Sequence, residues 1–329
     1  MSIEKNYSGK HVLITGGLGF IGSNLARTLV KLGAKITVID NLNPNSGANL
    51  QNVESIKNQI EIVEDDIKNE KHLKALLKDQ HYLFNLAGQN SHVGSMQDPF
   101  NDLHENVVAQ LKLLETCRLY NSTIKIVFSG TRQVYGRAKY LPVDEKHLLT
   151  PLDNNGVSKR AGEMYHIVYN RVYDMATCVV RMTNVYGPHM RIKDSHLTFV
   201  GWWIYQLLAG QTIQIYGDGS QIRDFNYVDD VVQALILCAS NPFAYGKIYN
   251  LGGEPITLLE LAEQMIQIYG TGNYEFISYP DNRKRIDIGD YYGDYNFINT
   301  ELGWSPQTPL IEGMKKTIEF YKQHKEHYL

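Results

Sequence analysis

A chain of 329 residues is long enough for one large domain or for two closely joined ones. Hydrophobic residues make up 43% of it and charged residues 20%, and the net charge of −3 is spread without a basic block, which argues against nucleic acid or a membrane surface as a partner. The N-terminal stretch "MSIEKNYSGK" has no apolar signal-peptide region, and no apolar run approaches the roughly 18 residues of a membrane span, so we expect a cytoplasmic protein.

Apolar runs typical of strands alternate with helical patterns through the first half of the chain. This alternation predicts an α/β fold, a Rossmann-type doubly wound parallel sheet with right-handed crossovers. The expected strands are 11–16, 35–41, 60–66, 82–88, 124–130 and 177–182, and the expected helices are 22–33, 67–79, 99–120 and 154–173.

The pattern becomes less regular from about residue 183. Helices are expected at 199–210 and 227–240, and a strand at 247–252. No linker rich in Pro, Gly or Ser separates the two halves, so we expect them to be interleaved. The expected domains are a Rossmann domain, 1–182, which also receives segments near 224–252, and a smaller C-terminal α/β domain, 183–329, that binds the substrate.

The three cysteines, Cys117, Cys178 and Cys238, lie far apart in apolar contexts. They form no CxxC motif and no Cys/His cluster. We therefore expect buried, reduced thiols, with no disulfide framework and no metal site.

A glycine-rich motif, "ITGGLGFIGSNLA", joins the first expected strand to the first expected helix. Gly16, Gly19 and Gly22 permit a tight turn, a close backbone approach to a pyrophosphate and close packing of the helix on the strand. Asp40 ends the second expected strand, where a carboxylate holds the hydroxyls of an adenosine ribose. A carboxylate there would repel a 2′-phosphate, so the motif predicts NAD rather than NADP.

Further motifs follow the glycine motif in a characteristic order: "DN" (40–41), "DDI" (65–67), "NLAGQ" (85–89), "NV" (106–107), "SGTRQVYG" (129–136), "GVSK" (156–159), "RMTNVYGP" (181–188), "GDGSQIRDFNYVDDV" (217–231) and "LGW" (302–304). With them the chain resembles the extended short-chain dehydrogenase/reductases over nearly its whole length. Within that family it is similar to NAD-dependent nucleotide-sugar epimerases and dehydratases such as UDP-glucose 4-epimerase.

The resemblance implies a set of cofactor-binding residues. Asp66 and Ile67 would flank the adenine, and Lys159 would hold the hydroxyls of the nicotinamide ribose. The whole set comprises Gly16, Gly19, Phe20, Ile21, Gly22, Asp40, Asn41, Asp66, Ile67, Leu86, Ala87, Gly88, Asn106 and Lys159.

The resemblance also implies a nucleotide sugar as the substrate, with UDP favoured by its frequency in the family. Arg223 and Arg285 would bind the diphosphate, with Arg283 as the competing choice for the second arginine, and Asn184 would touch it. Arg132 would either hold an anionic substrate group or form a structural ion pair. The substrate-binding set is therefore Arg132, Asn184, Arg223 and Arg285.

One position departs from the family pattern. In related enzymes a Tyr four residues before the Lys takes the hydroxyl proton while hydride leaves the sugar carbon. In "DNNGVSK" the Lys is present as Lys159, but Asn155 stands at the Tyr position and has no proton to give up near neutral pH. The residues expected at the reaction centre are Thr131, which matches the Ser/Thr that binds a substrate oxygen, with Lys159, Asn155, Tyr135 and His92.

The sequence leaves the replacement for the missing base open. A carboxylate one helical turn after Lys159, Glu163, would most simply form an ion pair with it. The open alternatives are Tyr135, His92, Glu163, Lys159 with a pKa lowered by burial, and a water held by Asn155 and Thr131.

A second departure concerns the two positions after Thr131. Family dehydratases carry an acid or an Asp-Glu pair there, whereas this chain has Arg132 and Gln133, neither of which is an acid at ordinary pH. We therefore expect an epimerase that transfers hydride transiently at a sugar carbon, with C4 as the expected position. The alternatives are a non-catalytic protein that binds NAD and a nucleotide sugar, or a reductase or dehydratase with an atypical base.

The resemblance further implies a homodimer built on the two helices at 99–120 and 154–173. The apolar positions that fit such an interface, and equally a core, are Val107, Leu111, Leu114, Met164, Val168 and Val172. The segment 193–203 should line the nucleobase pocket, but its residues do not identify the base.

Overall fold

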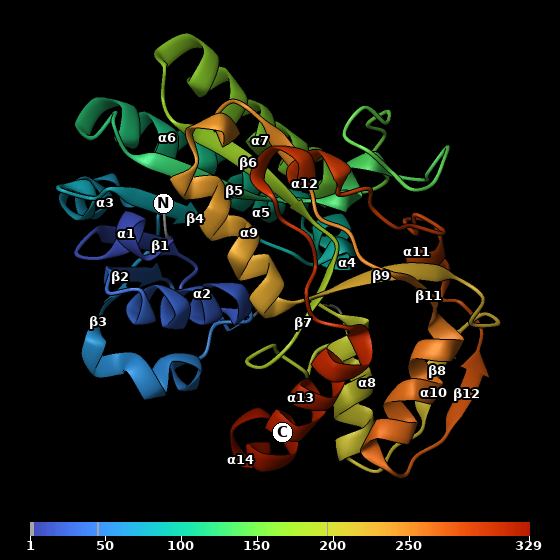
Figure 1. The fold of residues 1–329 in the computed structure, drawn as a ribbon. Helices are drawn as coiled ribbons and strands as arrows, with labels where there is room; N and C mark the ends of the chain where they lie inside the picture. The colour runs from blue at the N-terminus through green and yellow to red at the C-terminus, as the bar shows by residue number, and fades with distance from the viewer. Residues whose placement is uncertain (1–2, 45, 196) are drawn as a thin grey trace.

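A parallel sheet forms the centre of the larger of two lobes (Figure 1). The computed structural model describes residues 3–44, 46–195 and 197–329, so His196, in the segment expected to contact the nucleobase, lies outside the described residues. Across the sheet the strands lie in the order β10 (Ile248–Asn250), β6 (Thr177–Met182), β5 (Lys125–Thr131), β4 (Tyr82–Asn85), β1 (His11–Thr15), β2 (Lys35–Asp40) and β3 (Ile60–Glu64). Every pairing between them is parallel, which confirms the predicted doubly wound sheet.

Helices cover both faces of this sheet, as the apolar strands require, because strands buried on two sides read as continuous hydrophobic runs. One face packs against α2 (Phe20–Lys31) and α9 (Val228–Ser240). The other packs against α3 (Glu70–Leu77), α6 (Ala109–Tyr120) and α7 (Asn154–Tyr173). All three cysteines are buried in these layers.

The remaining elements of the larger lobe are short. They are α1 (Ile3–Tyr7), the 3₁₀ helix η1 (Leu50–Gln59), α4 (His92–Gln97), α5 (Pro99–Leu103), the π-helical turn η2 (His104–Val108), the 3₁₀ helices η3 (Arg132–Tyr135) and η4 (Pro242–Ala244), and α12 (Asn296–Leu302). The expected helix 99–120 is therefore divided among α5, η2 and α6. A π-helical turn often marks a functional site, and this one carries Asn106.

A smaller lobe has its own apolar core, in which side chains of α8, α10 and α13 meet. Its elements are β7 (Asn184–Tyr186), α8 (Phe199–Leu208), β8 (Ile213–Tyr216), β9 (Ile222–Tyr227), β11 (Pro255–Thr257), α10 (Leu258–Tyr269), β12 (Tyr274–Ile277), α11 (Asp281–Lys284), α13 (Leu310–Gln323) and α14 (Lys325–Tyr328). Between β9 and β11 the chain returns to the larger lobe, where α9 and β10 join the main sheet.

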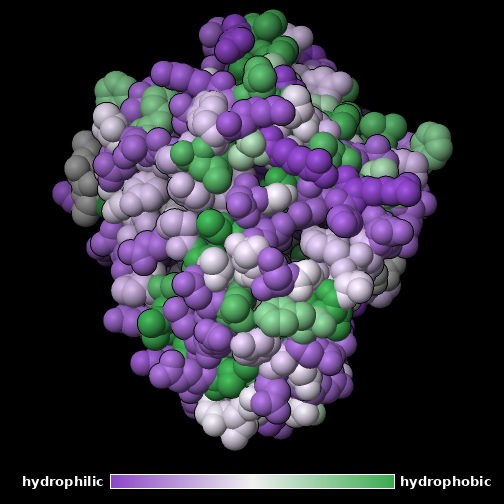
Figure 2. Space-filling model, turned by 90° about the vertical axis from the view of Figure 1, so that its right-hand side faces the viewer, coloured by the Kyte–Doolittle hydropathy of each residue, from purple (hydrophilic) through white to green (hydrophobic). Residues whose placement is uncertain are grey.

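The face that carries α10, α11 and β12 is mostly polar, and its hydrophobic residues form small separate groups (Figure 2). Among the described residues, none of the helices combines the length and the apolar character needed to cross a membrane.

Candidate active site

The glycine turn after β1 leaves no space for side chains. Gly16 adopts a φ of +67°, and a Cβ atom on Gly22 would lie 2.3 Å from the carbonyl oxygen of Gly16. A Cβ atom on Gly17 would lie 2.5 Å from that of Val38. The helix α2 therefore begins directly against the strand, and no side chain caps its N-terminus. Such an open, bare helix end suits the pyrophosphate of a dinucleotide.

Asp40 lies at the carboxyl end of β2, beside this turn. Its Oδ2 accepts a hydrogen bond from the Leu18 amide at 3.1 Å, and its Oδ1 accepts one from the Leu42 amide at 3.0 Å. Burial raises the pKa of the Asp40 carboxyl, and the two amide donors oppose that effect. Each oxygen keeps a lone pair for a ribose hydroxyl.

Two of the predicted cofactor-binding residues, Asn41 and Asp66, are joined to each other. Asn41 donates through Nδ2 to Asp66 Oδ2 at 3.0 Å, which links the end of β2 to the loop after β3. Ile67, the next residue, is buried against the sheet.

The predicted cofactor-binding residues Leu86, Ala87 and Gly88, which the family resemblance implies form a wall under the cofactor, follow β4. This strand ends at Asn85 rather than at 88, because the amides of Leu86 and Ala87 turn to donate to Thr15 Oγ1 at 3.0 and 3.1 Å. A Cβ atom on Gly88 would lie 2.5 Å from Asn106 Oδ1 and 3.3 Å from Lys159 Nζ. A larger residue would displace these two side chains, so the wall and Lys159 approach each other closely.

Lys159 is buried on α7, and its Nζ donates to the Ser129 carbonyl oxygen at 3.3 Å. The ammonium also lies 5.2 Å from the ring centre of Phe128. Burial lowers the pKa of Lys159 to about 8, although the negative charges of Asp102 and Glu163 oppose the shift. A lysine in this state can change its charge near neutral pH.

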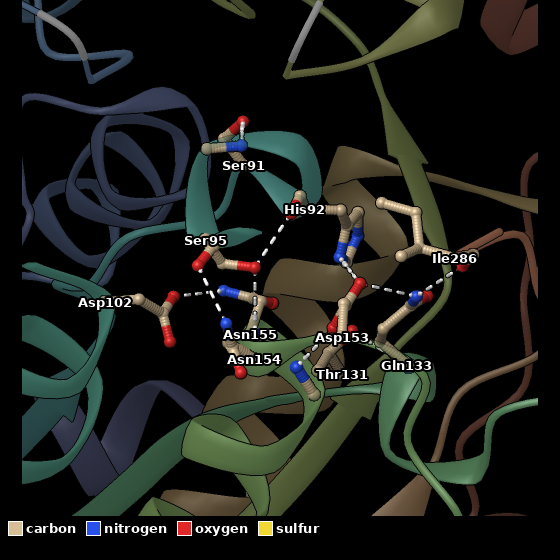
Figure 3. A network of polar contacts seen from close by, with 12 residues as sticks. Ser91, His92, Ser95, Asp102, Thr131, Gln133, Asp153, Asn154, Asn155 and Ile286 are labelled. Carbon is tan, nitrogen blue, oxygen red and sulfur yellow. Dashed lines mark hydrogen bonds and ion pairs between the residues drawn. The ribbon is translucent and has the colours of Figure 1, made fainter. Parts of the chain in front are cut away.

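Asn155 is only 2% exposed, and its amide group is held by a network of polar contacts (Figure 3). Its Nδ2 donates to the Gln89 carbonyl oxygen at 2.8 Å, to Gln89 Oε1 at 3.1 Å and to Asp102 Oδ1 at 3.2 Å. Its backbone amide donates to Ser95 Oγ at 3.1 Å. Asn155 is thus a fixed donor toward α4 and α5.

His92 and Asp153 form a pair beside Thr131 (Figure 3). Asp153 caps α7 by accepting from the Gly156 amide at 2.7 Å, and its Oδ2 accepts from Gln133 Nε2 at 2.9 Å. The same Oδ2 lies 2.9 Å from His92 Nδ1. The side chain of Asp153 is 0% exposed and that of His92 is 38% exposed, so the imidazole is anchored at one nitrogen and open elsewhere.

Two of the candidate bases are occupied elsewhere. The sequence led us to expect an ion pair between Glu163 and Lys159. Glu163 instead pairs with the buried Arg181, at 2.8 Å between Arg181 Nη2 and Glu163 Oε2. Tyr135 donates from its hydroxyl to Asn250 Oδ1 at 2.7 Å and accepts from Arg181 Nη1 at 2.7 Å. Burial raises the pKa of Tyr135 to about 12, so neither group is free to take a proton.

The predicted diphosphate residues lie at the smaller lobe. Arg223 is buried, with Nη2 at 3.1 Å from Asp287 Oδ1 and Nη1 donating to the Ile222 carbonyl oxygen at 2.9 Å. Asn184 donates through Nδ2 to the Asp224 carbonyl oxygen at 2.9 Å, on the strand β9 that also carries Arg223.

The two choices for a second arginine differ in their surroundings. Arg285 is exposed at the end of α11. Arg283 donates to the Ser195 carbonyl oxygen at 3.1 Å, and its guanidinium lies 5.6 Å from the ring centre of Tyr216. Burial raises the pKa of Tyr279, and the positive charges of Arg223 and Arg283 both oppose that shift, so both arginines lie near this tyrosine.

Three residues of this site were missed by the sequence reasoning. Asp153 had a readable signal, because an Asp directly before a helix often caps it. Asp102 and Gln89 had none, because their importance comes from contacts with Asn155, which is remote in sequence. In the described part of the chain, no cluster of His, Cys, Asp or Glu has the composition to hold a metal ion.

Comparison with known proteins identifies the family. A model described as the NAD dependent epimerase/dehydratase family matches residues 12–252. The protein belongs to this family. Its matching glycine turn and its Asp40 fit the dinucleotide that the family uses, and NAD is therefore its cofactor.

Relatives of this epimerase/dehydratase family member align along nearly its full length. The UDP-glucose 4-epimerase of Mycolicibacterium smegmatis is 33% identical over 94% of this chain and 98% of its own. The structure of UDP-glucose 4-epimerase with UDP-glucose from Thermotoga maritima matches with a TM-score of 0.86 and 30% identity, covering 96% of this chain and 99% of its own. That of dTDP-glucose 4,6-dehydratase from Bacillus anthracis in complex with NAD matches with a TM-score of 0.86 and 27% identity, covering 97% and 99%.

Proposed function

We propose that this protein is an NAD-dependent nucleotide-sugar epimerase that acts at C4 of the sugar, and that His92 and Asp153 supply the acid and base. The observation that carries the proposal is the His92–Asp153 pair beside Thr131, in a site that retains Lys159 but has Asn155 at the usual Tyr position. The names of the relatives from M. smegmatis and T. maritima support a UDP-sugar as the substrate.

The imidazole of His92 has the features of a general base. Asp153 Oδ2 lies 2.9 Å from Nδ1 and favours a proton on that nitrogen, which would leave Nε2 with a lone pair. Nε2 takes the proton of the sugar hydroxyl, and the buried Asp153 carboxylate stabilises the imidazolium that forms. The glycine turn, Asp40 and Lys159 would hold NAD, which would supply a hydride acceptor for the sugar carbon and a hydride donor for the return to its other face. His92 then gives its proton back, so the cycle has no net change in protons.

The neighbouring residues have supporting roles. Thr131, at the end of β5, presents its hydroxyl to the same sugar oxygen, and Lys159 holds the ribose hydroxyls of the cofactor. Gln133 is buried and its amide holds Asp153, so it positions the pair rather than moving a proton. Because Arg132 and Gln133 replace the acids of the dehydratases, elimination of water lacks its proton donor.

The experiment compares turnover in the native protein and in His92→Gln. The protein is mixed with UDP-, dTDP-, GDP- and CDP-sugars, and products are identified by NMR and mass spectrometry. The substitution should lower kcat by about 10²–10⁴-fold, because general acid–base catalysis contributes about that much. NAD affinity should be unchanged. His104→Gln, at an exposed position on η2, is the matched control and should keep full activity.

Two results would contradict the assignment. Full turnover in His92→Gln would exclude the histidine as base and leave Lys159, whose pKa is lowered to about 8, as the group to test next. A product whose mass is lower than that of the substrate by one water molecule would indicate a dehydratase instead.

A second candidate, a non-catalytic protein that binds NAD and a nucleotide sugar, is favoured by one observation. The Asn155 amide is held by Gln89 and Asp102, so the position of the usual base is built as a structural donor. Binding of all four classes of nucleotide sugar with no product, and no cofactor reduction, would support this candidate over the epimerase.

A homodimer and a cytoplasmic location stay predictions. On α7 the side chains of Met164, Val168 and Val172 are 39%, 42% and 61% exposed, which leaves an apolar stripe available for a second copy. Leu114, by contrast, is fully buried in the core of this chain and cannot contribute to an interface. Light scattering from the purified protein distinguishes one copy from two.

A further inference from the structure

No carboxylate in the described part of the chain forms an ion pair with Arg132. Among the described residues, no Asp or Glu oxygen lies within ion-pair distance of its guanidinium, and its buried Nε has no hydrogen-bond partner. The group lies 5.6 Å from the ring centre of Tyr291. Burial and the positive charge of Arg223 lower the pKa of Arg132 to about 10, so its surroundings oppose the charge that it carries.

The carboxylates nearest to Arg132 are already occupied. Asp224 is fully buried, and its Oδ2 accepts from the amides of Gly293 at 2.9 Å and Gly253 at 3.3 Å. Asp287 pairs with Arg223 at 3.1 Å. A partly buried guanidinium left in this condition is costly unless a ligand brings the missing negative charge.

The position of Arg132 indicates which part of a ligand would meet it. It directly follows Thr131, the residue placed at the reacting sugar carbon, and its neighbour on the other side is Arg223, placed at the diphosphate. Arg132 therefore lies on the sugar side of the diphosphate arginine.

We propose that Arg132 selects an acidic nucleotide sugar, one whose hexose carries a carboxylate. The guanidinium offers the planar fork of donors that binds a carboxylate through two parallel hydrogen bonds. This inference rests on the proposed function, because it uses the same sugar site. A carboxylate next to Thr131 would pair with the unpartnered guanidinium and would satisfy its buried Nε.

The test measures binding to the NAD-loaded protein by calorimetry. UDP, dTDP, GDP and CDP first identify the preferred base. The neutral hexose and its C6-carboxylate form, on that nucleotide, are then compared in the native protein and in Arg132→Gln. The native protein should bind the carboxylate form about 10–100-fold more tightly, which is the range for a hydrogen bond to a charged group. In Arg132→Gln that preference should disappear, while the neutral sugar binds within about twofold of native.

Arg137→Gln is the matched control, since Arg137 is exposed five residues further along and should leave both affinities unchanged. Equal binding of the two sugars to the native protein would overturn the inference. So would an equal loss for the nucleoside diphosphate, the neutral sugar and the acidic sugar in Arg132→Gln, because that result places the guanidinium on the diphosphate.

Stability supplies a second readout. Because no carboxylate among the described residues pairs with Arg132, Arg132→Gln should unfold at the native temperature or higher without ligand; a large loss of stability would reveal a structural partner and contradict the inference. A carboxylate preference without any turnover would support the inference and contradict the proposed epimerase activity. Absence of any nucleotide-sugar binding would contradict both.

Discussion

Asn155→Asp tests whether the amide at the position of the usual base is a structural donor. The substitution keeps the shape of the side chain and replaces the NH₂ group by an oxygen. That oxygen would lie about where Nδ2 now meets the Gln89 carbonyl oxygen at 2.8 Å and Asp102 Oδ1 at 3.2 Å. Hydrogen bonds would become contacts between acceptors, in a place that is 2% exposed.

The expected loss of stability can be estimated from these contacts. The hydrogen bond to the neutral Gln89 contributes about 1 kcal/mol and the one to the Asp102 carboxylate about 1.5–3 kcal/mol. Burial of a second negative charge beside Asp102 adds to the cost, and the Lys159 ammonium on the next turn offsets part of it. We expect a net decrease of about 3–5 kcal/mol in the free energy of unfolding at pH 8.

The loss should depend on pH with a definite sign. Burial and the Asp102 charge raise the pKa of the introduced carboxyl in the folded state above its unfolded value of about 3.9. The protonated form is therefore favoured by folding, and the stability of Asn155→Asp relative to native should be highest at low pH and fall as pH rises through the folded-state pKa.

The assay is urea unfolding of both proteins at several values of pH between 5 and 8. Asn154→Asp is the control, because Asn154 opens α7 and makes one side-chain hydrogen bond, to the Ser95 carbonyl oxygen at 3.1 Å, while an acid in a first helical turn is favourable. It should change stability by less than about 1 kcal/mol. Native stability of Asn155→Asp at pH 8 would refute the reasoning, since the side chain would then have turned toward Lys159.

Two further substitutions test the packing around the site: the buried ion pair beneath it and the glycine turn. Glu163→Gln should lower the free energy of unfolding by about 3–5 kcal/mol in urea unfolding, because it leaves the buried Arg181 without its carboxylate; a loss below 1 kcal/mol would mean that water reaches the guanidinium. Gly22→Ala should abolish NAD binding in calorimetry, because the added Cβ would lie 2.3 Å from the Gly16 carbonyl oxygen and push α2 away from the turn; native affinity for NAD would contradict that packing.

The main sheet and its helices could be predicted because their signals are local. Strands such as β1 carry an uninterrupted apolar run, and α2 begins at a glycine motif with one structural meaning. None of the strands described in the smaller lobe was predicted; β7 and β11, for example, have three residues each and little pattern. The end of β4 depends on Thr15, which is remote in sequence.

The pairing of polar side chains could not be predicted for the same reason. Helical spacing places Glu163 next to Lys159, yet β6 brings Arg181 to it with two donors aligned, and that tertiary contact prevails. His92 and Asp153 lie on separate elements, so only the folded chain brings them together. Sequence alone identified His92 as one of several candidates and could not choose among them.

The late arrival of β10 has a consequence for how the protein is made. This strand completes one end of the main sheet by pairing with β6, but the ribosome synthesises it only after β7, α8, β8, β9 and α9. Until then the growing chain carries β6 with its backbone groups unpaired on one side, and such an edge invites pairing with other nascent chains. We expect translation that stalls before residue 248 to yield an aggregation-prone fragment that depends on chaperones to stay in solution.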